Sequence, residues 1–230
     1  MKGIQMLTKG VNHEPTCIND FIFGNPESKL RIEDIVHNIE EIPFKGKSAI
    51  LIYGIFGTGK TALAKLLPNA IEKGKTGDAL NMPEDFIACQ EGFDGLKVTT
   101  LIGDVLSKVS LNNSGLHYFI IDEVDMLRKK TQESLKSVLN TTRAIFIMTT
   151  NNVSQLDKGL LDRCILVEMN AAEPEAYLPI ARQIVIEGGA VISDADLLPI
   201  IKGARGSFRN LFHNIGRQAR RNLPPPKIIY

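Results

Sequence analysis

Eight residues constrain this chain more than any others, because they predict a glycine-rich turn between a buried strand and a helix. Residues 54–61 read Gly-Ile-Phe-Gly-Thr-Gly-Lys-Thr, the pattern G-x-x-x-x-G-K-[ST], and the apolar run 49–53 stands directly before them. Glycine permits the positive φ that turns successive N–H groups inward, and the start of a helix adds partial positive charge. The alternative, a plain turn with a surface lysine, is disfavoured by the strand before it and the apolar helical pattern behind it. The turn therefore predicts a phosphate cradle.

The same pattern gives individual residues their expected roles. Lys60 would reach the β- and γ-phosphates of a nucleotide, and Thr61 would ligate Mg²⁺. The predicted nucleotide-binding residues are Gly54, Gly57, Thr58, Gly59, Lys60, Thr61 and Ala62.

A second chemical element is the segment 117–125, His-Tyr-Phe-Ile-Ile-Asp-Glu-Val-Asp. Apolar residues followed by carboxylates mark the carboxyl end of a buried strand, which is where open α/β sheets bind their ligands. Asp122 is expected to hold Mg²⁺, and Glu123 is expected to polarise an attacking water. These acids would otherwise open a solvated loop or cap a helix. The phosphate cradle earlier in the chain favours the catalytic interpretation.

A third strand candidate, 146–152, ends in hydroxyl and amide groups: Phe-Ile-Met-Thr-Thr-Asn-Asn. The side-chain amide of Asn151 would orient the lytic water and sense the γ-phosphate. Asparagine is also a favoured turn residue, so plain turn chemistry remains an equal alternative.

Short apolar runs alternate with helical patterns along most of the chain, which predicts parallel βα units. The expected strands are 49–53, 85–89, 118–121, 144–149 and 164–167, and the expected crossover helices are 61–72, 96–109 and 131–140. After residue 169 only helices are expected, at 173–187, 194–204 and 208–222, followed by a stiff proline-rich tail. We therefore predict an α/β core with a parallel sheet in residues 1–170 and a three-helix lid in residues 171–230.

Composition narrows the class of protein. The net charge of +1 over 230 residues lacks the broad basic field of a strong free-standing DNA binder. Three isolated cysteines without C-x-x-C spacing indicate neither a disulfide framework nor a zinc site. No apolar stretch approaches the roughly 20 residues of a membrane span, and no signal-peptide pattern begins the chain. We expect a cytoplasmic protein.

Together these motifs resemble the AAA+ ATPases, a P-loop NTPase family, and within them the ATPase subunits of sliding-clamp loaders. The order and spacing of the motifs are more specific than any one of them. The segment 119–125 resembles the Walker B motif, 149–151 resembles sensor 1, 161–164 is similar to the Ser-Arg-Cys box, and 206–209 resembles sensor 2. The resemblance implies ATP and Mg²⁺ as cofactors, with Asp122 and Thr61 at the metal and Glu123 and Asn151 at the attacking water. It also implies that Arg163 acts on a neighbouring subunit's ATP and that Arg209 acts from the lid.

The chain also departs from that family. Asp162 stands where the Ser-Arg-Cys box has serine, and the segment 132–137 lacks the usual pair of arginines. The chain ends at Tyr230, where clamp-loader subunits continue into a collar domain. We expect either a two-domain relative or assembly through another interface. Surface salt bridging for Arg163 and a solvated helix face for Arg209 remain the alternative interpretations.

For DNA, the resemblance points to Lys97, and position points to Arg128, Lys129 and Lys130 after the acidic strand. Such residues would contact the backbone rather than read sequence. They are equally typical of solvated helix faces.

The expected function is a DNA-stimulated ATPase in a homo- or hetero-oligomer, acting on a sliding clamp or another replication protein, with no membrane partner. In the cytoplasm this would place it at the nucleoid or in a phage or virus replication complex. The alternatives are a helicase loader, a transposition regulator, or a nucleotide-gated scaffold with little hydrolysis.

Overall fold

The computed structural model describes residues 15–89, 95–187 and 189–221. These residues form two compact units. One comprises residues 15–55 and 59–170, and we call it the core unit. The other comprises residues 171–221 together with 56–58, and we call it the helical unit. Each unit is described by itself.

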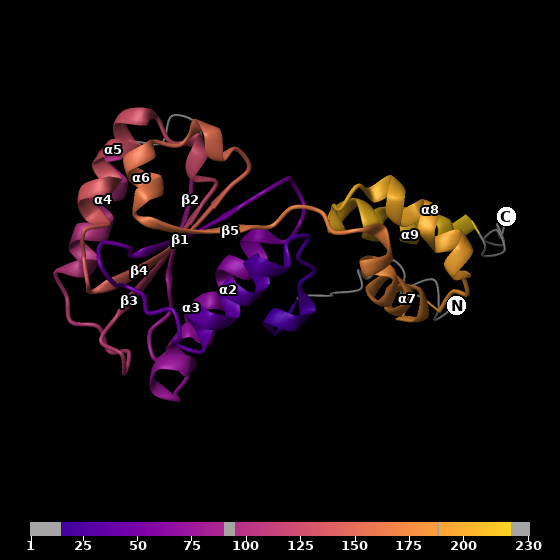
Figure 1. Cartoon of the computed structure of the whole chain (residues 1–230), viewed down its shortest axis with the longest axis horizontal. Coiled ribbons are helices and arrows are strands. Elements are labelled where there is room, and N and C mark those ends of the chain that lie inside the picture. Colours follow the sequence, from indigo (N-terminus) through magenta and orange to yellow (C-terminus); the bar gives the residue numbers. More distant parts are fainter. Residues whose placement is uncertain (1–14, 90–94, 188, 222–230) are drawn as a thin grey trace, which may run out of the picture. The chain divides into compact units, whose positions relative to one another are not determined.

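The core unit is built on one parallel sheet (Figure 1). Its strands are β1 (Ala49–Tyr53), β2 (Asp85–Ala88), β3 (His117–Asp122), β4 (Ala144–Thr150) and β5 (Cys164–Glu168). Their spatial order is β2-β3-β4-β1-β5, and every neighbouring pair is parallel. β1, which leads into the glycine-rich turn, therefore lies between β4 and β5. The predicted α/β fold with a parallel sheet is confirmed.

Helices cover both faces of the sheet because its strands are apolar on both sides. α2 (Pro26–Val36) and α3 (Lys60–Thr76) pack on one face, and α4 (Gly95–Leu106), α5 (Lys129–Val138) and α6 (Lys158–Asp162) pack on the other. Short 3₁₀ turns occur at η1 (Ile18–Asp20), η2 (Val124–Met126) and η3 (Val153–Gln155).

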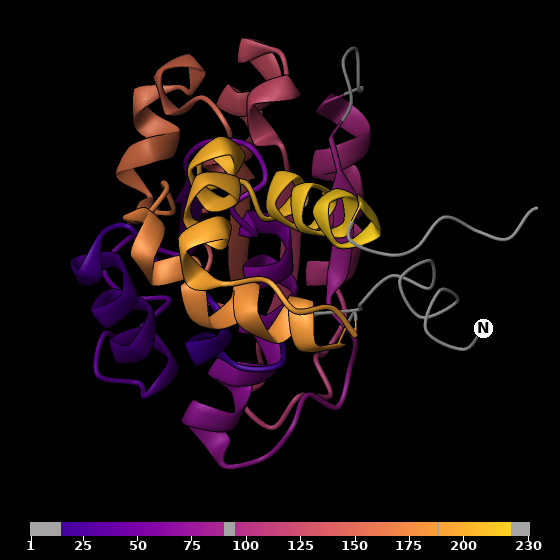
Figure 2. The ribbon, with the colours of Figure 1, turned by 90° about the vertical axis from the view of Figure 1, so that its right-hand side faces the viewer.

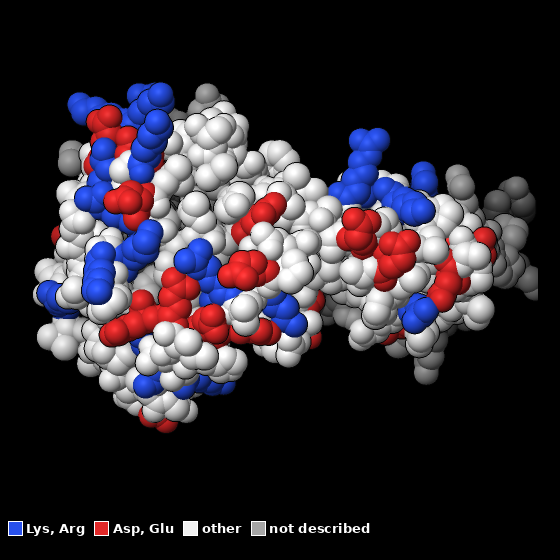
Figure 3. All heavy atoms as spheres, viewed as in Figure 1, with Lys and Arg blue, Asp and Glu red and all other residues white. Residues whose placement is uncertain are grey.

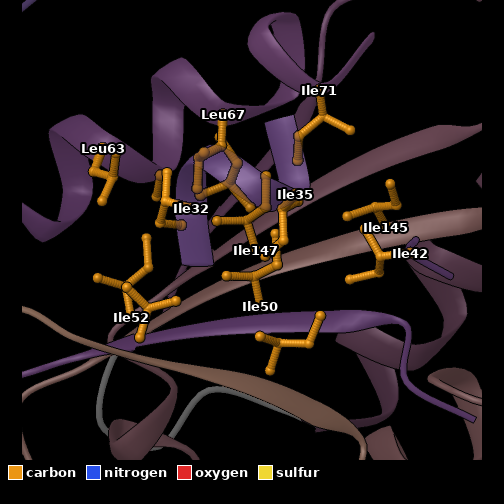
Figure 4. Packing of buried hydrophobic residues seen from close by; sticks show 14 of the residues in the cluster. Ile32, Ile35, Ile42, Ile50, Ile52, Leu63, Leu67, Ile71, Ile145 and Ile147 are labelled. Atoms are coloured by element: carbon orange, nitrogen blue, oxygen red, sulfur yellow. The ribbon is translucent and has the colours of Figure 1, made fainter. Parts of the chain in front are cut away.

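Alternate residues of each strand supply the two cores. Ile50 and Ile52 of β1 join the core under α2 and α3, whereas Ala49 and Leu51 join the core on the opposite face. Figure 4 shows the first of these cores, where isoleucine and leucine side chains from the two helices meet those of the strands. All four of these β1 side chains are fully buried, so the strand that positions the glycine-rich turn is held from both faces.

α2 was not among the expected helices. It begins after Asn25, whose side-chain carbonyl accepts a hydrogen bond from the N–H of Glu27, and Pro26 occupies its first turn. This is a favourable start signal, because an Asn cap and an N1 proline both suit a helix N-terminus. Ile32 and Ile35 anchor the helix in the core. The strands and helices that were predicted are present, and their ends differ from the prediction by a few residues.

The helical unit contains η4 (Pro174–Tyr177), α7 (Leu178–Glu187), α8 (Asp194–Ala204) and α9 (Phe208–Arg221). The three α-helices pack against one another, and Figure 2 shows them in orange to yellow. The Arg182 guanidinium of α7 binds both carboxylate oxygens of Asp194 at the start of α8, at 2.9 and 2.5 Å. Gly188 and the predicted tail at 223–226 lie outside the described residues.

Positive and negative side chains are interspersed over the face seen in Figure 3. Within the described residues, no helix has both the length and the apolar character to span a bilayer.

Candidate active site

The glycine-rich turn between β1 and α3 has the backbone that its sequence predicts. Gly54, Gly57 and Gly59 adopt positive φ values of 150°, 81° and 95°. A Cβ atom on Gly54 would lie only 2.5 Å from the carbonyl oxygen of Met169, so the turn approaches the end of β5 too closely for a side chain. α3 begins at the end of the turn, with Gly59 as its N-cap. The turn thus joins a left-handed backbone to a helix N-terminus, which suits an anionic ligand.

Lys60 is the basic group of this turn. Its side chain is 7% exposed, and its ammonium donates to the carbonyl oxygens of Gly54 at 2.9 Å and Ile55 at 2.6 Å. Burial lowers the pKa of Lys60, while the nearby charges of Asp125, Asp122 and Glu123 raise it in part. The lysine and the three acids at the end of β3 and just after it therefore share one electrostatic environment.

The Thr61 hydroxyl and the Asp122 carboxylate lie side by side. The hydroxyl donates to the carboxylate oxygens at 2.9 and 3.2 Å, which joins the first turn of α3 to the end of β3. No cluster of three or more His, Cys, Asp or Glu side chains suited to a metal occurs in the described part of the chain. Mg²⁺ needs no such cluster, because it binds through one or two protein oxygens together with substrate phosphates and water. The two residues present fit that mode.

Thr149 near the end of β4 completes the link between the acids. Its hydroxyl donates to Asp122 at 2.5 Å and accepts the backbone N–H of Glu123 at 2.9 Å. Glu123 has φ of 57°, a left-handed conformation that costs a non-glycine residue about 1–3 kcal/mol. Its side chain is exposed, while its backbone is held by Thr149. The arrangement separates Asp122, directed at Thr61, from Glu123, free to face solvent.

The sequence pointed to Asn151 in this region, whereas the structure gives Thr149 the contacts with the acids. Asn151 follows β4 directly and is half-buried. The next residue, Asn152, donates its N–H to the Thr150 hydroxyl at 3.0 Å, which is ordinary turn chemistry. The sequence signal for Thr149 was a hydroxyl at the end of an otherwise apolar strand.

Arg163 lies at the amino ends of the strands, whereas the glycine-rich turn lies at their carboxyl ends. It caps α6, and its guanidinium donates to the Asn140 side chain at 2.9 Å and to the Gly159 carbonyl at 2.8 Å. The following residue, Cys164, pairs with Ala49, the first residue of β1, whereas the turn follows the last residue of that strand. The four residue steps along β1 span about 13 Å, more than an arginine side chain reaches. Arg163 therefore does not serve the turn of its own chain.

Comparison with known proteins agrees with this geometry. Residues 50–170, more than half of the chain, match the family described as "ATPase family associated with various cellular activities (AAA)". The chain belongs to the AAA ATPase family.

Individual relatives of this AAA ATPase are distant. The chain is 24% identical over an alignment of 232 positions to Lon protease of Cytophaga hutchinsonii, covering 86% of this chain and 28% of the relative. It is 26% identical over 167 residues to the Holliday junction branch migration complex subunit RuvB of Mycoplasmopsis pulmonis, covering 70% of this chain and 51% of the relative. A solved structure of Thermotoga maritima RuvB superposes with a TM-score of 0.66 at 18% identity, covering 88% of this chain and 64% of that one. The chain thus spans less than two thirds of these relatives, and the structural likeness shows the fold.

The other charged residues singled out from the sequence lie on exposed surfaces of the AAA ATPase. Arg209 is exposed in the first turn of α9, in the helical unit. Lys97 is exposed in the first turn of α4. Arg128, Lys129 and Lys130 are exposed where α5 begins.

A cavity of about 610 Å³ lies next to this start of α5. Lys129 and Lys158 line it together with Asp125 and Asp157. One carboxylate oxygen of Asp125 is buried and has no hydrogen-bond partner among the residues that the structure describes. Charges of both signs meet in this cavity, so it does not favour one class of ligand.

Proposed function

We propose that this chain is an ATP-hydrolysing AAA+ ATPase that acts on DNA as part of an oligomer, in the manner of a clamp-loader subunit. The observation that carries the hydrolytic part is the continuous hydrogen-bonded link from Thr61 through Asp122 and Thr149 to the backbone of Glu123. It brings a hydroxyl, a carboxylate suited to metal and a candidate base to one edge of the sheet. A site that only holds nucleotide has no need of a second carboxylate on a strained backbone.

The residues in and beside this link have distinct roles in the proposal. Lys60 binds the β- and γ-phosphates of ATP, and Thr61 and Asp122 hold Mg²⁺. The metal, when bound, neutralises charge on the phosphoryl group in transfer. Glu123 polarises the attacking water, and Asn151 orients that water and senses the γ-phosphate.

Replacing the candidate base tests hydrolysis separately from binding. Glu123→Gln should lower turnover about a hundredfold or more while leaving Mg-ATP affinity nearly unchanged, because the amide cannot accept a proton. Glu133→Gln, a change at an exposed site on α5, is the matched control. Turnover that survives Glu123→Gln would support the alternative, a nucleotide-gated scaffold subunit with little hydrolysis.

Two lines of support favour DNA as the substrate of the motor. One relative is named as a branch migration subunit for Holliday junctions, which are DNA. Exposed cations also gather where α4 and α5 begin, at Lys97 and Arg128–Lys130. Phosphate contacts of this kind bind the backbone without reading sequence and weaken with salt. Another relative is named as a protease, so the alternative substrate to consider is an unfolded polypeptide.

Stimulation of ATP hydrolysis distinguishes these substrates. Primed duplex DNA should raise turnover at low salt, and an unfolded polypeptide should not. Lys97→Ala should weaken DNA binding and reduce the salt slope by about 1. Lys73→Ala, which removes an exposed lysine near the far end of α3, should leave both unchanged. Stimulation by polypeptide and not by DNA would remove the DNA assignment.

The partner is proposed from the resemblance of residues 119–125 and 161–164 to clamp-loader motifs. A sliding clamp should bind the chain in the presence of a non-hydrolysable ATP analogue. Binding to a replicative helicase or a transposition protein instead would favour the loader or regulator alternatives. We place this activity in the cytoplasm, at the nucleoid or in a phage or virus replication complex.

A further inference from the structure

The Glu168 carboxylate at the end of β5 is shared by two side-chain amides. Asn170 donates to one oxygen at 2.6 Å, and Asn25 donates to the other at 3.1 Å. Glu168 pairs in register with Tyr53, the last residue of β1, so the carboxylate lies beside the start of the glycine-rich turn. Its charge reaches this strand, because together with the larger effect of burial it raises the pKa of Tyr53. Among the described residues, two side-chain amides therefore hydrogen-bond to this acid.

The second function of the Asn170 amide is to hold the turn itself. Its carbonyl oxygen accepts the backbone N–H of Ile55 at 3.0 Å. The same oxygen would lie 3.0 Å from a Cβ on Gly54, so Asn170 stands directly behind the first peptide of the turn. The amide orientation is fixed from both ends, since the reverse orientation would place NH₂ against N–H and oxygen against carboxylate.

The peptide group that Asn170 binds also accepts a hydrogen bond from Lys60. The N–H of Ile55 and the C=O of Gly54 belong to a single planar peptide. Asn170 binds that N–H, and the Lys60 ammonium donates to that C=O at 2.9 Å. Rotation of the peptide plane would move the N–H and the C=O together. The orientation of this plane therefore fixes an acceptor of the lysine.

We propose that Asn25, Glu168 and Asn170 form a positioning relay that fixes the Gly54–Ile55 peptide and so places Lys60 for the phosphates. The inference rests on the proposed binding of Mg-ATP at the turn. Asn25 also caps α2, so the relay connects the start of that helix to the phosphate cradle. Asn170 is a positioning residue, because it acts through the peptide and through Lys60.

Loss of affinity in single variants and its rescue by a second substitution test the relay. Asn170→Ala should raise the dissociation constant for Mg-ATP about tenfold, the effect of one lost hydrogen bond that orients a binding group. Asn170→Asp should weaken binding further, because it sets a second carboxylate against Glu168. Adding Glu168→Gln to Asn170→Asp restores a donor opposite the new carboxylate and should recover most of the affinity.

Asn69→Ala is the matched control. Asn69 accepts the backbone N–H of Leu80 at 3.0 Å, the same kind of contact away from the turn. It should lower thermal stability without changing Mg-ATP affinity. Wild-type affinity in Asn170→Ala, or no recovery in the double variant that folds as judged by circular dichroism, would overturn the relay. Failure of the wild-type protein to bind Mg-ATP would instead overturn the proposed function.

Discussion

At the scale of single residues, the site depends on which side chain connects the two acids. Thr149 is 1% exposed and satisfies Asp122 and the Glu123 backbone at once. It thereby holds the backbone of Glu123, the proposed base, in its left-handed conformation. A single hydroxyl thus contacts both the carboxylate proposed to hold Mg²⁺ and the backbone of the proposed base.

Thr149→Val is the first prediction. Valine keeps the volume of threonine but removes the acceptor of the part-buried Glu123 N–H, so the free energy of unfolding should fall by about 1 kcal/mol. ATP turnover should fall more steeply than Mg-ATP affinity, because the base loses its support. Thr150→Val is the control, since its hydroxyl accepts a turn N–H from Asn152 and not the N–H of Glu123. Equal kinetic losses in both variants would show that the link has no catalytic role.

Gly54→Ala gives a second prediction at this scale. The substitution adds both backbone strain at φ of 150° and a contact with the Met169 carbonyl. Gly115→Ala adds strain alone, since φ is 72° and, apart from the adjoining residues, no described atom lies within 4 Å of its Cβ position. Backbone strain alone should lower the free energy of unfolding of each variant by about 1–2 kcal/mol. Denaturant unfolding should show a larger loss for Gly54→Ala, accompanied by loss of Mg-ATP binding. Equal losses would indicate that the end of β5 moves away freely.

Local chemistry made some of these residues predictable and left others hidden. The glycines, Lys60 and Thr61 follow from one contiguous pattern, and their geometry is local. Thr149 was hidden because its partner is set by the register of β3 and β4, which pairs Ile121 with Met148 and so brings Asp122 beside Thr149. The position of Asn170 behind the turn likewise depends on β5 lying next to β1.

At the scale of elements, the sequence predicted long periodic segments better than short or capped ones. All five strands were predicted because parallel strands buried on both faces are continuous apolar runs. α6 has five residues, too few to show a helical period. α2 has a start signal at Asn25 and Pro26 but a mixed polar pattern afterwards.

α6 offers a prediction on pH. The Asp157 carboxylate caps this helix, and its pKa is held below the ordinary value of 3.8, first by Lys136 and then by the N–H groups of Leu160 and Gly159. A lowered pKa in the folded state means that the stabilisation is present above pH 3.8 and is lost as the pH falls through the folded value.

Thermal unfolding between pH 2.5 and 7 tests this cap. At pH 7 the melting temperature should decrease from wild type to Asp157→Asn to Asp157→Ala, because the amide keeps an acceptor for the cap but loses the charge. The gap between wild type and Asp157→Asn should narrow toward the acid end, as the pH falls below 3.8 and approaches the lowered pKa of folded Asp157. A gap that stays constant with pH would contradict the assigned cause.

At the scale of the whole molecule, the glycine-rich turn and Arg163 lie at opposite ends of two neighbouring parallel strands. The glycine-rich turn follows the carboxyl end of β1, and Arg163 precedes the amino end of β5, its neighbour. A head-to-tail interface between copies brings opposite edges of two subunits together and leads to rings or spirals. In such an assembly, Arg163 of one copy would complete the site of the next.

Mixing two inactive variants is the last prediction and follows from this separation. Lys60→Ala removes the phosphate cation of a site, and Arg163→Ala removes the arginine offered to the neighbouring site. Each variant alone should hydrolyse ATP very slowly, because an arginine finger is worth about 10³-fold or more.

In an equal mixture, a site is complete when its own chain retains Lys60 and its neighbour retains Arg163. Random assembly makes about a quarter of the sites complete, so about a quarter of the wild-type rate should return. Mixing Lys60→Ala with a chain that carries both substitutions leaves every site without Lys60 and should stay inactive. If the first mixture co-assembles by mass measurement and still shows no recovery, Arg163 does not act between subunits, and its hydrogen bonds to Asn140 and Gly159 account for its place in the fold.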